Sequence, residues 1–249
     1  MKILNRNRFK KLPKGMIFDL DNTLYEYEVC NVNAMSCISK IVSNKFKISE
    51  SNFINYYEKA RLQVKKRLTG SASSHSRLLY IKEAFEYMKI GSQIETIIEL
   101  EQAYWNKYLE KAVLFSGVYE FLKILKDRGI VLTCLTNLNT FIQLKKIYYL
   151  NLEKVFDYII TSEEIGLEKP NKMCFILAQN KMKLSGEEIW MIGDDLVADI
   201  SGAKNSINST TILRTKNNIN SFEQPSVDAY FFDYNKLNNL FDKINKSYV

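Results

Sequence analysis

After Gly117 the chain alternates between short apolar runs and amphipathic segments, and this alternation limits the possible fold more than any other feature. Apolar runs predict buried strands, and apolar residues at three- and four-residue spacing predict helices. Strands that alternate with helices form a parallel sheet with helices on both faces, joined by right-handed crossovers. The predicted strands are 130–136, 158–161, 189–193, 209–213 and 230–232, and the predicted helices are 118–127, 140–149, 171–181 and 197–205.

One further strand, 15–20, is predicted well before this region. Between it and the alternating part, residues 25–112 carry apolar side chains at helical spacing and no strand pattern. A helical insertion after the first strand explains this order. We therefore predict a doubly wound, Rossmann-like α/β core, residues 1–26 and 114–249, with an inserted α-helical cap domain, residues 27–113.

Acidic residues follow two of the predicted strands. Asp19 and Asp21 lie at the end of the first strand, and Asp194, Asp195 and Asp199 follow a later one. Each group alone could serve as turn or N-cap residues. In open parallel sheets, however, ligands bind beyond the carboxyl ends of the strands, where both groups are expected to meet. Crowded carboxylates repel one another, and the hard cation Mg²⁺ suits such a set.

Three other polar residues are expected at the same edge of the sheet. Thr136 and Asn137 end the strand 130–136, and Lys169 precedes Pro170, which favours an extended or turn conformation. A hydroxyl, an amide and an ammonium group can all donate hydrogen bonds to phosphate oxygens. Together with the carboxylates, these groups suit transfer of a phosphoryl group to an aspartate.

These residues occur in motifs that resemble those of the haloacid dehalogenase superfamily of phosphohydrolases. The motifs are DLDNT at 19–23, LTN at 135–137, Lys169 in GLEKP, and GDDLVAD at 193–199, in the order that the family has. The helical insertion looks like the family's type-one cap. The resemblance implies a Mg²⁺-dependent phosphatase that acts on a small phosphorylated metabolite.

The resemblance also implies a role for each catalytic residue. Asp19 matches the nucleophile that becomes an aspartyl-phosphate, and Asp21 matches the general acid that later acts as base. Thr136 matches the phosphate-binding hydroxyl, and Lys169 the lysine that bridges nucleophile and phosphate. Because a free aspartate has a pKa of about 3.9, we expect anionic neighbours to raise the pKa of Asp21 for the acid step.

The implied metal site involves residues from both acidic groups. Asp194 matches the Mg²⁺ ligand that joins the Asp19 carboxylate and the main-chain carbonyl of Asp21. Asp195 is expected as a second ligand acting through water, and Asp199 is expected to orient the ligands rather than bind the ion.

Two alternatives to a phosphatase stay open. A sugar-phosphate mutase would use the same pair, Asp19 and Asp21, and a binding or regulatory member would carry an idle site. The carboxylate at Asp21 argues against dehalogenation, because the true dehalogenases of the family lack it.

Within the helical insertion, the loop 70–77 (GSASSHSR) is rich in Gly and Ser and contains the only histidine of the chain. Such a loop could present His75 and Arg77 to the substrate, alongside Thr136, Asn137 and Lys169. It could equally be a plain linker between helices. Nucleotides, sugar phosphates and phospho-acids are all substrates of this class of enzyme, and the sequence does not choose among them.

The net charge of +7 is concentrated at the start of the chain, where residues 1–14 hold six Lys or Arg and no acidic residue. A solvated extension explains this arm better than a nucleic-acid contact, because no aromatic-rich basic face accompanies it. No apolar run approaches the roughly 18 residues that span a bilayer, and the four cysteines show no CxxC spacing. We expect a cytoplasmic protein without membrane contact, either a monomer or a homodimer.

Overall fold

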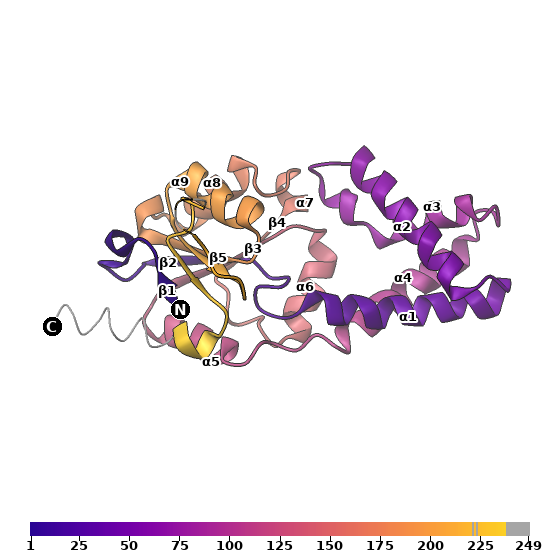
Figure 1. Ribbon diagram of the computed structural model, residues 1–249, viewed down its shortest axis with the longest axis horizontal. Coiled ribbons are helices and arrows are strands. Elements are labelled where there is room, and N and C mark those ends of the chain that lie inside the picture. Colours follow the sequence, from indigo (N-terminus) through magenta and orange to yellow (C-terminus); the bar gives the residue numbers. More distant parts are fainter. Residues whose placement is uncertain (221, 223, 238–249) are drawn as a thin grey trace.

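The computed structural model describes residues 1–220, 222 and 224–237, which form a sheet-based core with a block of helices beside it (Figure 1). The sheet of the described chain has seven strands in the order β1-β7-β6-β5-β2-β3-β4, and every neighbouring pair is parallel except β1 and β7. The predicted α/β class with a parallel sheet is confirmed. The strands are β1 Lys2–Ile3, β2 Gly15–Phe18, β3 Val131–Thr136, β4 Tyr158–Thr161, β5 Ile189–Gly193, β6 Thr210–Arg214 and β7 Ala229–Phe231.

The helices fall into two groups, one beside the sheet and one packed on its faces (Figure 1). None of the helices in the described residues is both long and apolar enough to span a bilayer. The first group is α1 Tyr27–Phe46, α2 Glu50–Arg67, α3 Arg77–Tyr87 and α4 Ile94–Leu109; the second is α5 Val118–Asp127, α6 Thr140–Tyr149, α7 Ser162–Ile165, α8 Lys172–Met182 and α9 Gly202–Ile207. Shorter turns are η1 Arg6–Phe9, η2 Ala72–His75, η3 Gly186–Glu188 and the π-helical η4 Leu196–Ser201.

The two faces of the sheet are covered by different helices. Successive side chains of a strand point to opposite faces. In β2, Phe18 accordingly packs in the apolar cluster that includes Phe121 of α5, whereas Ile17 packs with Phe175 of α8 and Ala203 of α9. The strand is therefore apolar throughout because both of its faces are buried.

We call residues 27–113 the helical block, since α1 to α4 all lie within it. The two chain segments that lead into and out of the block run side by side: Tyr25 pairs with Leu114, and Phe115 N donates to Leu24 O at 2.9 Å. The division of the chain into domains at 26–27 and 113–114 stays a prediction, and its C-terminal limit at 249 lies outside the described residues.

The segment predicted as one helix, 197–205, is instead η4 followed by α9. Asp195 O accepts hydrogen bonds from both Asp199 N, at 3.1 Å, and Ile200 N, at 3.2 Å, which widens the first turn. The wide turn directs the Asp199 carboxylate against Gly193. A Cβ atom at Gly193 would lie 2.3 Å from Asp199 Oδ2, so glycine allows this close approach.

The N-terminal arm is part of the core, so the expectation of a solvated extension is wrong. Residues Lys2–Ile3 form β1 and pair with β7. Phe9 is buried, and its ring meets that of Trp190 edge-on with 5.0 Å between centroids. The apolar residues interspersed among the arm's basic ones anchor it to the sheet, while basic side chains such as Lys10 stay exposed.

Replacing Phe9 by alanine should therefore destabilise the whole core. We expect Phe9→Ala to lower the free energy of unfolding by about 3 kcal/mol, the usual cost of deleting a buried phenyl group. Lys10→Ala, at the exposed neighbouring position, is the matched control and should change it by less than about 0.5 kcal/mol. Urea unfolding measures both; equal stability of the two variants would mean that the arm is not anchored.

Candidate active site

Every residue singled out from the sequence lines one cavity of about 360 Å³ between the carboxyl ends of the strands and the helical block. This volume lies near the lower end of the range for small-molecule sites. Polar side chains thus converge from segments far apart in the sequence. The residues in question are Asp19, Asp21, His75, Arg77, Thr136, Asn137, Lys169, Asp194, Asp195 and Asp199.

Lys169 is the buried cation at the centre of this cavity wall. Its Nζ atom lies 2.7 Å from Asp19 Oδ1 and 2.7 Å from Asp199 Oδ1. Burial lowers the pKa of Lys169, but the attraction of the two carboxylates outweighs it and raises the pKa overall. Asn137 holds the lysine backbone in place: Asn137 Oδ1 accepts from Lys169 N at 2.9 Å, and Asn137 Nδ2 donates to Lys169 O at 3.3 Å.

Three carboxylates crowd around this lysine. Oxygen atoms of Asp19, Asp194 and Asp199 all lie within 4.8 Å of one another. Burial, and after it Asp199, raises the pKa of Asp194 to about 6, and burial also raises that of Asp19 despite the opposing effect of Lys169. Three carboxylates around one lysine leave negative charge that the lysine does not neutralise when all three are ionised. An oxygen-only set of this kind fits a hard divalent cation.

The side chains of two predicted metal residues, Asp21 and Asp195, are not part of this cluster of three. Asp195 Oδ1 instead caps η4, accepting from Val197 N at 2.8 Å and Ala198 N at 2.7 Å. Asp199, expected only to orient the ligands, contributes its carboxylate to the cluster and also accepts from Asp195 N at 3.1 Å.

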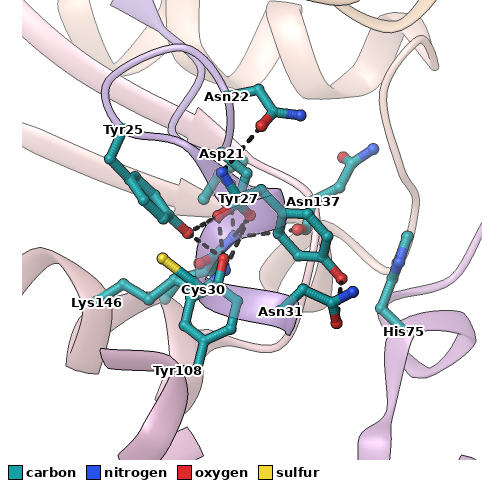
Figure 2. A network of polar contacts seen from close by, with 12 residues as sticks. Asp21, Asn22, Tyr25, Tyr27, Cys30, Asn31, His75, Tyr108, Asn137 and Lys146 are labelled. Atoms are coloured by element: carbon teal, nitrogen blue, oxygen red, sulfur yellow. Dashed lines mark hydrogen bonds and ion pairs between the residues drawn. The ribbon is translucent and has the colours of Figure 1, made fainter. Parts of the chain in front are cut away.

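Asp21 faces a cation rather than anions. Figure 2 shows Lys146 and Tyr25 reaching its carboxylate; Lys146 Nζ lies 2.8 Å from Oδ1 and 2.9 Å from Oδ2, and the Tyr25 hydroxyl donates to Oδ1. Burial alone would raise the pKa of Asp21, but Lys146 and the hydrogen bonds outweigh it, so the pKa is lowered. The expectation that anionic neighbours raise the pKa of Asp21 is therefore wrong.

Sequence reasoning missed Lys146 and Gln143, which both come from α6. Gln143 Nε2 donates to Thr136 Oγ1 at 2.6 Å and to Asp21 Oδ2 at 3.3 Å, so it links two predicted catalytic residues. The sequence did offer one clue. Gln143 and Lys146 are three residues apart, so they share a face of α6, and the buried Ile142 lies on the same side of the helix.

The loop with His75 contacts the core. His75 Nε2 lies 2.9 Å from Glu168 Oε1, and Glu168 N donates to Gly70 O at 3.0 Å, next to Lys169. Arg77 is not on a flexible loop, since it begins α3 and is buried. The predicted substrate contacts of His75 and Arg77 stay predictions, although both residues line the cavity.

With this geometry in hand, comparison with known proteins identifies the family. The sequence model of one protein family, the haloacid dehalogenase-like hydrolases, matches residues 13–206 of this chain. These residues include all four motifs and the helical block. The chain belongs to this family.

Relatives of this haloacid dehalogenase-like hydrolase include phosphatases. A ribulose-1,5-bisphosphate 5-phosphatase of Halopiger xanaduensis is 37% identical over 203 residues, which cover 81% of this chain and 84% of that one. A glyceraldehyde 3-phosphate phosphatase of Methanocaldococcus jannaschii is 26% identical, covering 92% of this chain and 96% of that one. The family and these relatives identify the chain as a hydrolase of phosphate monoesters.

Solved structures share the fold of this hydrolase. A 2-haloacid dehalogenase from Pseudomonas syringae pv. tomato superposes with a TM-score of 0.72 at 19% identity, covering 93% of this chain and 99% of that one. A phosphatase of the same family from Thermococcus onnurineus gives a TM-score of 0.66 at 21% identity, covering 91% and 97%.

Removing Lys146 should expose its structural role at Asp21. Breaking a fully buried pair costs about 3–5 kcal/mol. Because the Asp21 side chain is 26% exposed, we expect Lys146→Met to lower the free energy of unfolding by less, about 2 kcal/mol. Lys145→Met, at the exposed preceding position, should cost less than about 0.5 kcal/mol. Chemical denaturation compares the two, and equal losses would argue against the ion pair.

Proposed function

We propose that this hydrolase releases phosphate from a small phosphorylated metabolite in a Mg²⁺-dependent reaction that passes through an aspartyl-phosphate at Asp19. The observation that carries the proposal is the Asp19 carboxylate itself. Its two oxygens are held by different donors, Lys169 Nζ at 2.7 Å and the Thr23 hydroxyl at 2.9 Å, at the wall of the cavity. A carboxylate fixed in this way is oriented for attack.

In the first step an Asp19 carboxylate oxygen attacks phosphorus, a new O–P bond forms, and the bond to the leaving oxygen breaks. Lys169 supplies positive charge beside the transferring group. The Thr136 hydroxyl accepts its hydrogen bond from Gln143, so its own proton is available to a phosphoryl oxygen. Asn137 acts indirectly, by holding the Lys169 backbone.

Asp21 serves as the acid and then the base. Paired with Lys146, it is ionised, which suits the second step, where it takes a proton from the water that attacks phosphorus and releases Asp19. The first step needs a proton for the leaving oxygen. Burial lowers the pKa of Lys146, and its ammonium group contacts both Asp21 oxygens, so Lys146 can pass a proton to Asp21, which delivers it to the leaving oxygen. The proton that Asp21 takes from water in the second step then returns to Lys146.

Mg²⁺ would be held by Asp19, Asp194 and the main-chain carbonyl of Asp21, with Asp195 acting through water and Asp199 adding charge beside them. When bound, the ion offsets the crowded negative charge and stabilises that of the phosphoryl group.

The size of the cavity and the names of the relatives favour a small substrate. The relatives reported above are named for ribulose 1,5-bisphosphate and glyceraldehyde 3-phosphate. We propose a sugar phosphate or a phospho-acid of similar size in preference to a nucleotide. A monomer or homodimer in the cytoplasm, as expected from the sequence, stays a prediction.

The proposal is tested by phosphate release from sugar phosphates, phospho-acids and nucleotides. We expect turnover of at least one small compound, and Asp19→Asn should lower kcat/KM at least ~1000-fold in protein that circular dichroism shows to be folded. Undiminished turnover by purified Asp19→Asn protein would refute the mechanism. Conversion of the substrate to an isomer without phosphate release would indicate a mutase instead.

Metal dependence forms a separate test. Chelation by EDTA should abolish phosphate release, and added Mg²⁺ should restore it. Asp194→Asn should raise the Mg²⁺ concentration needed for half-maximal rate at least about tenfold, and Asp195→Asn should raise it less, because Asp195 Oδ1 is already engaged by two backbone N–H groups. Full activity in EDTA would contradict the assignment.

A further inference from the structure

The cavity wall is electrically asymmetric. The core contributes five carboxylates and two lysines to it, and both lysines are paired with carboxylates of the core. The carboxylates are those of Asp19, Asp21, Asp194, Asp195 and Asp199, and the lysines are Lys146 and Lys169. The helical block contributes six residues of the described chain, and none of them is acidic. They are Tyr27, Arg61, Lys65, His75, Arg77 and Tyr80. A ligand bound across the cavity therefore meets the phosphoryl-transfer site at one end and positive charge at the other.

Arg77 is a buried cation, and no carboxylate of the described residues forms an ion pair with it. Its side chain is buried, and its guanidinium donates to the His75 carbonyl and to the Tyr27 hydroxyl, both at 2.7 Å. The Nε–H group is buried and has no acceptor within the part of the chain that the structure describes. Aromatic rings surround the group, and the nearest, that of Trp105, has its centroid 5.0 Å away. A buried donor without an acceptor is costly unless something completes it.

Lys65 and Arg61 add to the same side of the cavity. They lie four residues apart on α2, so they share a face of the helix. Lys65 is half-buried, and its ammonium makes no hydrogen bond or ion pair with a described residue, whereas Arg61 is paired with Glu58 at 2.7 Å. Arg61, Lys65 and Arg77 line the same cavity. Burial lowers the pKa of Lys65, and repulsion from Arg61 and Arg77 lowers it further.

We propose that Arg61, Lys65 and Arg77 form a second anion site, so that the substrate carries a second phosphate or carboxylate besides the phosphoryl group that is removed. The proposal rests on the proposed function for the site at Asp19. It assigns the substrate to the bisphosphates and phospho-carboxylates of small metabolites. An anion there would offset the repulsion among the three cations and offer acceptors to Lys65 and Arg77.

Two matched pairs of compounds test this assignment. One is ribulose 1,5-bisphosphate against ribulose 5-phosphate, and the other is 3-phosphoglycerate against glycerol 3-phosphate. In each pair only the first compound has the second anion, a phosphate in one case and a carboxylate in the other. We expect kcat/KM of the wild-type enzyme to favour the first compound at least tenfold in at least one pair, and that pair identifies the anion.

Substitution of Lys65 tests whether the basic cluster causes the preference. Lys65→Met should reduce the ratio of kcat/KM within the preferred pair about tenfold, the usual effect of losing one charged hydrogen bond. The control is Lys66→Met, at the next and exposed position of α2, which should keep the wild-type ratio. Equal turnover within both pairs by the wild type, or an equal change of the ratio in both variants, would overturn the proposal.

A binding measurement separates this proposal from the proposed function. Asp19→Asn protein, with and without Lys65→Met, is titrated calorimetrically with the same four compounds. Tighter binding of a two-anion compound that is lost with Lys65→Met would support the second site even if no compound were turned over. Equal binding within each pair would overturn the second site while leaving phosphatase activity intact.

Discussion

The buried ion pairs of Lys169 with Asp19 and Asp199 are the interaction on which the rest of the site depends. Three carboxylates brought to within 4.8 Å of one another would repel strongly in a dry environment, and one lysine offsets part of that repulsion. The parallel sheet explains why they meet, because β2 and β5 are neighbours and their carboxyl ends point the same way. The remaining negative charge is what makes a divalent cation suitable there.

A second buried pair, Lys146 with Asp21, gives the two aspartates of the first motif different electrostatic surroundings. Each aspartate contacts a lysine. Burial, helped by the neighbouring carboxylates, raises the pKa of Asp19 despite Lys169, whereas Lys146 and the hydrogen bonds lower the pKa of Asp21 despite its burial. Two carboxyl groups two residues apart can thus take different roles, one as nucleophile and one in proton transfer. The helical block completes the cavity with positive charge opposite both of them.

Much of this could be predicted from sequence because it depends on local patterns. Strands and turns appear as apolar runs with polar ends, which placed Asp19 and Asp194 at one edge of the sheet. The Lys146–Asp21 contact spans 125 residues, and no local pattern says which lysine of α6 faces inward to meet which aspartate. The strand β1 is two residues long, too short for any periodicity, so its pairing with β7 could not be foreseen. The π-helical turn at Asp199 depends on the closeness of Gly193, which only the folded chain shows.

The central claim is that Asp19 becomes covalently phosphorylated. It is tested most directly by mixing Asp21→Asn protein with a compound that the wild type hydrolyses, quenching in acid, and locating any phosphoryl group by peptide mass spectrometry. The account predicts a phosphoryl adduct on Asp19 that decays slowly, because the base for its hydrolysis is missing. Consumption of substrate with no adduct on Asp19, or an adduct on another residue, would contradict it.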